Sequence, residues 1–210
     1  MEKKFKTTQE EFWSGEFGNE YINRNISEKL LASNVHFFAN VLSQADPIVN
    51  VIEFGSNVGM NLKALRILLP EAELSGIEIN EKAYLELMSN NGIKGYHTSI
   101  LDFNETKKWN LVLIKGVLIH ISPDELQNVY QKLYDASDKY ICIAEYYNPT
   151  PVVLNYRGHE GKLFKRDFAG EMMQKFPDLV LDRYGFAYHK DKQFPQDDIT
   201  WFLLKKENRK

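Results

Sequence analysis

From Val49 onward, short runs of apolar and β-branched residues alternate with segments in which apolar residues recur every three to four positions. The runs predict strands, and the segments between them predict helices. This alternation favours βαβ units, and the nearly continuous apolar character of the strands favours a parallel sheet with helices on both faces. We therefore expect an α/β fold. The predicted strands span residues 49–54, 74–79, 95–100, 110–115 and 140–145, and predicted helices include residues 60–69, 81–88 and 166–176.

The last part of the chain breaks this pattern. Residues 179–189 and 199–204 are extended segments joined by a charged loop, with no helical segment between them. Two strands connected in this way pair in antiparallel fashion. We expect a mostly parallel sheet that ends in an antiparallel hairpin.

The first 46 residues predict a helical cap. Asn25-Ile26-Ser27-Glu28 has the spacing of a capping box, and apolar residues follow it at helical spacing as far as Leu42. Pro47 ends this segment, because proline restricts the residue that precedes it. With no linker or repeat inside the chain, we expect one domain over 1–210, made of a cap at 1–46 and a core at 47–210.

Composition excludes several classes of function. Twenty-six lysines and arginines against 29 acidic residues give a net charge of −3, so no basic surface for nucleic acid or an anionic membrane is expected. The single cysteine, Cys142, excludes a disulfide framework and a cysteine-rich zinc site. The charged first ten residues lack the apolar stretch of a secretion signal. We expect a cytoplasmic protein without a metal, acting on a small molecule as a monomer or a homodimer.

The first predicted strand runs into the turn Glu53-Phe54-Gly55-Ser56-Asn57-Val58-Gly59-Met60-Asn61. Gly55 and Gly59 remove side chains where a ligand must approach the backbone, and asparagine tolerates the left-handed conformation. A dinucleotide site requires G-x-G-x-x-G, of which only the first glycine is present. Glu53 would repel a pyrophosphate but would attract a cationic ligand.

Further polar residues follow the other strands. Glu78, which lies 25 residues after Glu53, could accept hydrogen bonds from ribose hydroxyls, and Asp102 could read the amino edge of adenine. Lys115 ends the fourth strand, His120 follows it, and Glu145 ends the fifth strand. Parallel strands end at one edge of a sheet, so these residues should share one rim. Structural roles also fit: Asp102 as a cap, His120 as a core histidine, and Glu145 in an ion pair.

With these residues the chain resembles class I S-adenosylmethionine methyltransferases, and more narrowly the pseudaminic acid biosynthesis-associated methylases. The resemblance covers nearly the whole chain and implies a Rossmann-like sheet and S-adenosylmethionine as the cofactor. Its specific marks are Phe12-Trp13, Gly15-Glu16-Phe17-Gly18, Tyr21-x-x-Arg24-Asn25, Tyr156-Arg157-Gly158-His159, Phe194-Pro195, Asp197-Asp198 and Thr200-Trp201. The cofactor-binding residues suggested by the resemblance and by the strand tips are Tyr21, Arg24, Glu53, Gly55, Ser56, Asn57, Gly59, Asn61, Glu78, Ile79, Asp102, Phe103 and Lys115.

The expected reaction is methyl transfer to oxygen or nitrogen of a small polar acceptor, such as a nonulosonic amino sugar or a nucleotide sugar. The candidates for a catalytic base are His120, Glu145 and His159. Tyr146, Tyr147 and Arg157 are candidates for binding the acceptor, and the arginine could hold a carboxylate or phosphate. Two alternatives stay open: a nicotinamide-dependent sugar oxidoreductase and a non-catalytic partner protein that retains the cofactor pocket.

Overall fold

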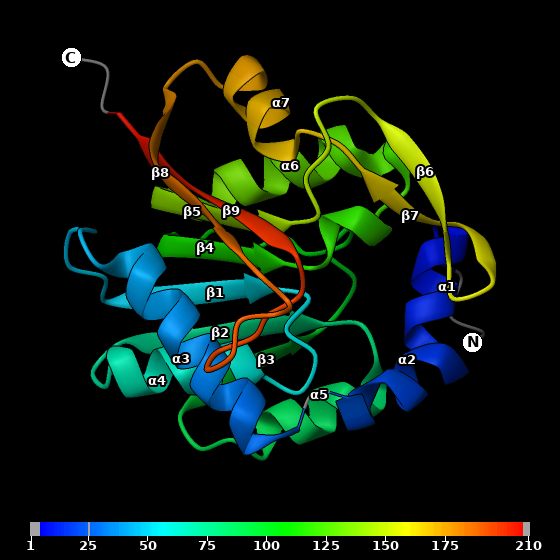
Figure 1. Ribbon diagram of the computed structural model, residues 1–210, viewed down its shortest axis with the longest axis horizontal. Helices are drawn as coiled ribbons and strands as arrows, with labels where there is room; N and C mark the ends of the chain where they lie inside the picture. Colours follow the sequence, from blue (N-terminus) through cyan, green and yellow to red (C-terminus); the bar gives the residue numbers. More distant parts are fainter. Residues whose placement is uncertain (1–4, 25, 208–210) are drawn as a thin grey trace.

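The computed structural model describes residues 5–24 and 26–207 (Figure 1). Within these residues the main sheet has seven strands in the order β3-β2-β1-β4-β5-β9-β8. Strands β1 to β5 are parallel, and β9 pairs antiparallel with both β5 and β8. The strands are β1 Asn50–Phe54, β2 Glu73–Glu78, β3 Ile93–His97, β4 Trp109–Lys115, β5 Ser137–Glu145, β8 Leu179–Ala187 and β9 Ile199–Lys206. The predicted α/β fold with a terminal antiparallel hairpin is confirmed.

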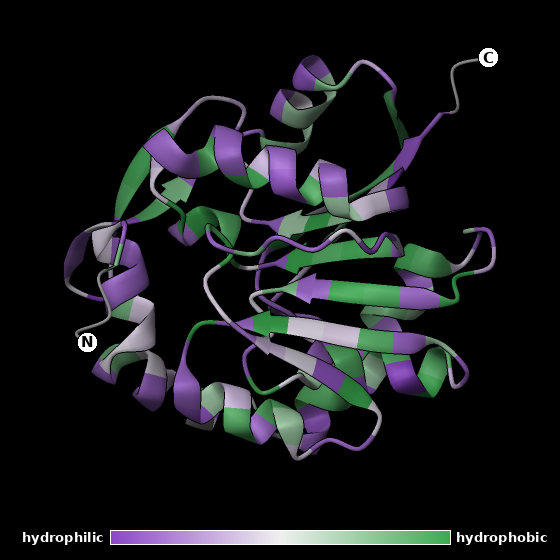
Figure 2. Ribbon diagram, turned by 180° about the vertical axis from the view of Figure 1, so that it is seen from behind, coloured by the Kyte–Doolittle hydropathy of each residue, from purple (hydrophilic) through white to green (hydrophobic). Residues whose placement is uncertain are grey.

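Side-chain alternation along the strands builds two hydrophobic layers. In β1, Val51 faces one layer, and Ile52 and Phe54 face the other. Helices α3 (Glu28–Leu42), α4 (Met60–Leu68) and α5 (Glu81–Met88) contribute to the first layer, and α6 (Leu126–Ala136) and α7 (Phe168–Lys175) to the second. Figure 2 shows the hydrophobic strands enclosed between helices whose outer surfaces are largely hydrophilic. The sheet is therefore buried on both faces, as its apolar strands predict.

The order of the strands fixes where a ligand can bind. From β1 the chain adds β2 and β3 on one side of the sheet, whereas β4 and β5 lie on the other side. The connections leave the sheet in opposite directions from β1 and β4, which opens a crevice at the carboxyl ends of these two strands. Each strand carries a charged residue near this end: Glu53 is the residue before the last in β1, and Lys115 is the last residue of β4.

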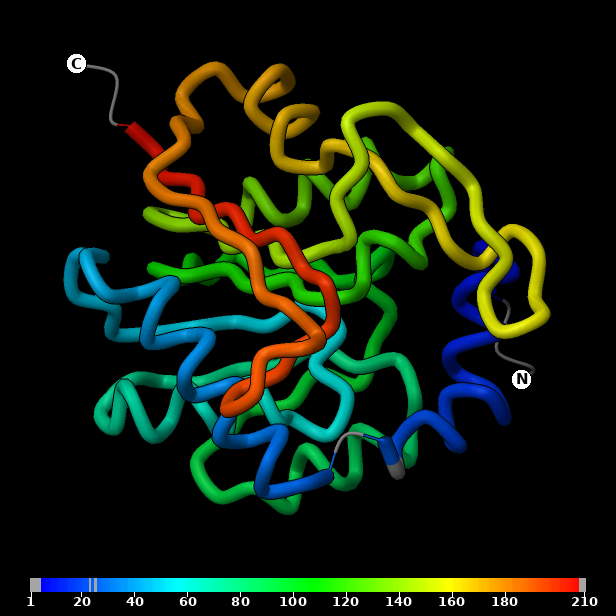
Figure 3. The backbone as a smooth tube through the Cα atoms, viewed as in Figure 1, coloured from blue at the N-terminus to red at the C-terminus, as the bar shows by residue number. Residues whose placement is uncertain are grey.

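The start of the chain lies beside a hairpin that the sequence did not predict. Helix α1 (Thr8–Ser14), helix α2 (Glu16–Tyr21) and the 3-10 turn η1 (Ile22–Arg24) run past the carboxyl ends of the strands. The hairpin consists of β6 (Val152–Tyr156) and β7 (His159–Lys165), and Figure 3 shows it against the N-terminal segment. The Lys162 ammonium joins the two by donating to the Thr8 carbonyl at 2.9 Å.

The division between cap and core differs from the predicted boundary at residue 46. Helix α3 packs on α4, and its Phe37, Phe38 and Val41 belong to the core layer. The segment before α3 runs past the rim, whereas α3 is part of the core and lines the cavity through Leu30 and Asn34. Ser27 begins α3 by accepting a hydrogen bond from the Leu30 amide at 3.1 Å. The predicted capping residue Asn25 lies outside the described residues.

Other boundaries moved by a few residues. Strand β5 begins at Ser137, before the predicted start at Tyr140, and β3 ends at His97, before the predicted end at Ile100. Ser122-Pro123 opens the 3-10 turn η3 (Pro123–Glu125), and α6 follows it directly. Among the described helices, none combines the length and the apolar character that crossing a bilayer would take.

Candidate active site

A cavity of about 560 Å³ lies at the carboxyl ends of the strands, a volume typical of small-molecule sites. Its walls come from the β1–α4 turn, the ends of β2 and β4, the N-terminal segment and the loop between β8 and β9. Twelve of the residues predicted for the site line it. They are Tyr21, Arg24, Gly55, Ser56, Asn57, Asn61, Glu78, Ile79, Lys115, His120, Tyr146 and Arg157.

The turn between β1 and α4 brings backbone to the cavity wall. Gly55, Asn57 and Gly59 have φ of 78°, 47° and 82°, so the turn visits the left-handed region three times. A Cβ on Gly55 would lie 2.7 Å from Cγ2 of Val117, which leaves no room for a side chain. Gly59 is required for another reason: it begins α4, and a Cβ there would lie 2.7 Å from Cδ1 of the buried Leu87. The absence of side chains at Gly55 and Gly59 lets the backbone of the turn pack directly against Val117 and Leu87.

Glu78 lies at the end of β2 with its carboxylate oriented by backbone amides. One oxygen accepts from the Asn57 amide at 2.8 Å and the other from the Asn80 amide at 2.7 Å. Burial raises the pKa of this carboxyl, and the amide hydrogen bonds act against that rise. A carboxylate oxygen can accept more than one hydrogen bond, so both oxygens retain capacity for a diol.

Glu53 lies behind the cavity wall, in contact with Asn61. Its Oε1 accepts from Asn61 Nδ2 at 2.6 Å. Burial raises the pKa of Glu53 to about 8, and the Asn61 hydrogen bond and the positive charge of Lys115 lower it. Within residues 5–24 and 26–207, Glu53 Oε2 and Asn61 Oδ1 are buried and have no hydrogen-bond partner. The unpaired carboxyl oxygen of Glu53 and the unpaired amide oxygen of Asn61 form a site that would fit an ammonium group.

Lys115, at the end of β4, is partly buried and lines the cavity. Burial lowers its pKa, and the negative charges of Glu53 and Asp197 raise it. The Lys115 ammonium lies 5.6 Å from the ring centroid of Phe37 on α3. Lysine and glutamate therefore share one side of the sheet at the crevice.

The segment after β3 presents different residues from those predicted. Asp102 is exposed and forms an ion pair with Lys6 at 2.5 Å, and it does not line the cavity. The Phe103 ring is in the core, edge-to-face with Phe54 at 5.5 Å. Instead, Thr98, Ser99, Ile100 and Leu101 line the cavity.

His120 is buried and lies in the cavity wall between two aromatic rings. Its ring centroid is 4.7 Å from that of Trp13 and 4.6 Å from that of Tyr156. Nδ1 lies 2.6 Å from the carbonyl oxygen of Lys162 in β7. Burial lowers the pKa of His120 to about 4, so the imidazole is neutral at pH 7.

Glu145 does not line the cavity, because successive side chains of β5 alternate between the two faces of the sheet. It points to the side of Ile141 and Ile143, and its Oε1 accepts from the amides of Val117 and Leu118 at 2.9 Å each. Burial raises its pKa to about 7, and these amide bonds lower it. The carboxylate thus holds the start of η2 (Leu118–His120), the turn that carries His120.

The remaining predicted residues divide between the cavity and the surface. Tyr146 lines the cavity and donates to Asp197 at 3.0 Å, whereas Tyr147 is exposed and lies outside it. Arg157, at the tip of the β6–β7 hairpin, lines the cavity and lies 5.6 Å from the Tyr156 ring. His159 does not line the cavity and packs its ring 4.9 Å from Phe12.

Several residues that line the cavity were not predicted from the sequence. Glu10 and Ser99 are buried, line the cavity and are hydrogen-bonded to each other. Asn34 and Gln196 form a second buried pair, with Gln196 Nε2 donating to Asn34 Oδ1 at 2.8 Å. Thr7 and Glu10 have the spacing of a capping box, and this pattern in the sequence predicts the start of α1. No local pattern predicts that Glu10 meets Ser99 or that Asn34 meets Gln196, because the partners lie far apart in the chain.

The strand order, the terminal hairpin and the glycine turn define a Rossmann-like class I methyltransferase fold. No protein-family model matches the chain, and no curated protein matches it. Solved structures do match. The plantazolicin methyltransferase BpumL, in complex with a pentazolic desmethylPZN analog and SAH, has a TM-score of 0.65 at 16% identity, covering 96% of this chain and 95% of that chain.

Two further solved structures show the same likeness. The 1,6-didemethyltoxoflavin-N1-methyltransferase of Burkholderia thailandensis, with bound 1,6-didemethyltoxoflavin and S-adenosylhomocysteine, has a TM-score of 0.67 at 10% identity over 96% of this chain and 88% of that one. The magnesium protoporphyrin IX methyltransferase of Synechocystis PCC 6803, with bound SAM, has a TM-score of 0.67 at 13% identity over 99% of this chain and 100% of that one. These similarities establish the fold.

Proposed function

We propose that the protein is an S-adenosylmethionine-dependent methyltransferase that acts on oxygen or nitrogen of a small polar acceptor. The observation that carries the proposal is the pair of acids on either side of the Gly55–Gly59 turn. Glu78 lines the cavity, and Glu53 lies behind its wall in contact with Asn61, which lines it. A nucleoside with a cationic tail needs acceptors at both of these positions. The similar structures with bound SAM or SAH support the same reading.

The cavity fits this cofactor at each end. Glu78 would accept hydrogen bonds from the ribose hydroxyls, and Ile79 would pack beside the nucleoside. The unpaired oxygens of Glu53 and Asn61 would receive the α-ammonium group. Arg24, which lines the cavity from η1, would pair with the carboxylate. When bound, the cofactor supplies a methyl group on a sulfonium, which is already an activated electrophile.

His120 is the residue best placed to assist the acceptor. Its Nδ1 donates to a carbonyl, so Nε2 has a free lone pair. A neutral imidazole can accept a proton from a hydroxyl or an amine as the new bond forms. Glu145 would act through the backbone of η2 rather than on the acceptor, since its carboxylate is on the other side of the turn. His159 would shape the cap by packing on Phe12.

The acceptor would lie between the aromatic residues of the cap and the β6–β7 hairpin. Trp13, Tyr156 and His120 form one wall, and Arg157 stands at its edge. An acidic amino sugar of the nonulosonic type, free or nucleotide-linked, combines an apolar ring face with a carboxylate or phosphate. Such an acceptor would use the aromatic wall and the guanidinium together, and the sequence resemblance supports it.

Calorimetry tests the proposal directly. Wild-type protein is titrated with S-adenosylmethionine, S-adenosylhomocysteine and NAD. We expect binding of the two sulfur nucleosides and none of NAD, and we expect Glu78→Ala to weaken that binding about ten- to a hundredfold. The matched control is Glu71→Ala, an exposed acid in the turn before β2, which should bind as the wild type does. Binding of NAD alone would overturn the proposal in favour of an oxidoreductase.

Turnover is tested separately from binding. Purified protein with isotope-labelled S-adenosylmethionine is offered acidic amino sugars, their nucleotide-linked forms and neutral sugars as controls. Formation of S-adenosylhomocysteine that depends on an acidic amino sugar would support the acceptor class. Cofactor binding without turnover on any of them would count against that class and would favour a non-catalytic role.

A further inference from the structure

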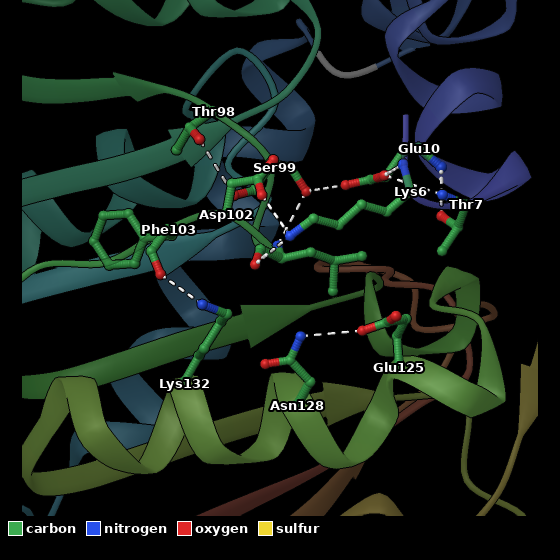
Figure 4. Close-up of polar contacts among 11 residues, drawn as sticks. Lys6, Thr7, Glu10, Thr98, Ser99, Asp102, Phe103, Glu125, Asn128 and Lys132 are labelled. Atoms are coloured by element: carbon green, nitrogen blue, oxygen red, sulfur yellow. Dashed lines mark hydrogen bonds and ion pairs between the residues drawn. The ribbon is translucent and has the colours of Figure 1, made fainter. Parts of the chain in front are cut away.

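A buried carboxylate from the N-terminal segment lies in the cavity beside the residues that follow β3. Glu10 is 9% exposed, lines the cavity and accepts a hydrogen bond from the Ser99 hydroxyl through Oε1. Figure 4 shows its carboxylate directed toward Ser99, whereas the nearby Asp102 is joined to Lys6. The acid that reaches the cavity here comes from α1, not from the strand that ends beneath it.

The hydrogen bonds of Glu10 leave one oxygen with capacity for a ligand. Oε2 accepts from the Lys6 and Thr7 amides at 2.6 and 3.1 Å, which completes the capping box of α1. Oε1 accepts from Ser99 alone among the described residues, and a carboxylate oxygen can accept a second bond. The carboxylate is therefore oriented by its own helix and still able to accept from the cavity.

A hydrogen-bond donor stands next to this acceptor. Ile100 directly follows Ser99 and lines the cavity, and within residues 5–24 and 26–207 its backbone amide donates to no group. The Ser99 hydroxyl is already engaged, since it donates to Glu10 and accepts from the Leu101 amide at 3.0 Å. The Glu10 carboxylate is an acceptor and the Ile100 amide is a donor, and Ser99 lies next to both. Adenine offers the matching pair on one edge, because its amino group donates and the adjacent N1 accepts.

We propose that Glu10 recognises the exocyclic amino group of the cofactor's adenine while the Ile100 amide donates to N1. This inference rests on the proposed function and specifies one end of that site. Base recognition then requires α1 to be docked, and the exposed ion pair between Lys6 and Asp102 at 2.5 Å joins the N-terminal segment to the residues that follow β3. Asp102 is a docking residue for the N-terminal segment, and its carboxylate does not meet the base.

The test compares two nucleosides that differ only at this edge. S-inosylhomocysteine carries an oxygen in place of the amino group and a hydrogen on N1, so it opposes both Glu10 and Ile100. Calorimetry gives Kd for S-adenosylhomocysteine and S-inosylhomocysteine in the wild type, Glu10→Gln, Glu10→Ala and the control Glu11→Ala. Glu11 is an exposed acid on the same helix. The measured quantity is the ratio of the two Kd values, because a misplaced helix would weaken both ligands alike.

We expect the wild type and Glu11→Ala to prefer the adenosine ligand by at least about a hundredfold. Glu10→Ala should reduce that ratio at least about tenfold, with a smaller reduction in Glu10→Gln, whose amide oxygen can still accept. An unchanged ratio in Glu10→Ala, with affinity for both ligands reduced equally, would overturn the inference and leave Glu10 as a docking residue. Failure of the wild type to bind either ligand would instead overturn the proposed function.

Discussion

The Nδ1 atom of His120 lies 2.6 Å from the carbonyl oxygen of Lys162. A carbonyl can only accept a hydrogen bond, so Nδ1 carries the proton and Nε2 is left as an acceptor. Burial lowers the pKa of His120 to about 4, which keeps this tautomer neutral at pH 7. The β6–β7 hairpin thus sets the chemical state of a histidine that another part of the chain brings to the cavity.

Replacing His120 should impair turnover far more than cofactor binding. We expect His120→Gln to lower kcat about a hundred- to ten-thousandfold, because general-base catalysis contributes on that scale. Kd for S-adenosylhomocysteine, measured by calorimetry, should change less than about threefold. His36→Gln, at an exposed histidine of α3, is the matched control. Equal losses of kcat in both variants, or a full kcat in His120→Gln, would contradict the assignment.

Cofactor binding should release a proton from Glu53. Burial raises its pKa to about 8, so the free protein holds this carboxyl mostly protonated at pH 7. A bound ammonium favours the ionised form, and hence Kd for S-adenosylhomocysteine should rise by up to about tenfold for each pH unit that the pH is lowered below 8. Titrations in two buffers of different ionisation enthalpy measure the released proton directly. Glu53→Gln should release none, and proton uptake by the wild type would refute this role.

Ionisation of Glu145 should destabilise the fold as the pH rises. Burial raises its pKa to about 7, above the ordinary value of 4.5, so the folded state binds more protons than the unfolded state between these values. Stability then declines from pH 4.5 to pH 7, by about 3 kcal/mol for this group. Burial lowers the pKa of His120 to about 4, which has the opposite effect between pH 4 and its ordinary 6.5.

The variant Glu145→Gln separates these two contributions. Glutamine can still accept from the Val117 and Leu118 amides but cannot ionise. Urea unfolding at several pH values gives the free energy of unfolding of wild type and variant. The difference between them should move in favour of the variant as the pH rises from 5 to 8, and the contribution of His120 cancels. A difference that is independent of pH would show that Glu145 stays charged throughout.

The β1–α4 turn and Glu78 could be predicted from the sequence because their geometry is local. Gly55 and Gly59 directly follow β1 and predict a turn there, and Glu78 is the last residue of the next strand. Strand alternation also separates Glu145 from the side of Lys115, an argument that the sequence permits once the strand is assigned. Local sequence patterns therefore suffice to predict the β1–α4 turn and the residues at the strand ends.

The contacts that complete the site are not local and could not be predicted in this way. Glu10 meets Ser99 across 89 positions of the chain, and His120 meets Lys162 across 42. The sequence places Asp102 after the third predicted strand, where it could read the amino edge of adenine, but the chain turns after Ser99 and directs Asp102 toward Lys6. Such pairings depend on how the N-terminal segment and the hairpin pack, which no local pattern determines.

Trp13 provides a last prediction, because its indole nitrogen is a buried donor without an acceptor in the described part of the chain. A buried donor left unpaired is costly, so Trp13→Phe should lower the free energy of unfolding by less than about 1 kcal/mol or raise it. If the acceptor substrate receives this donor, its KM should rise about tenfold in the variant, with Kd for S-adenosylhomocysteine unchanged. Urea unfolding and steady-state kinetics measure the two effects. A large loss of stability with an unchanged KM would show that Trp13 serves only packing against His120 and Tyr21.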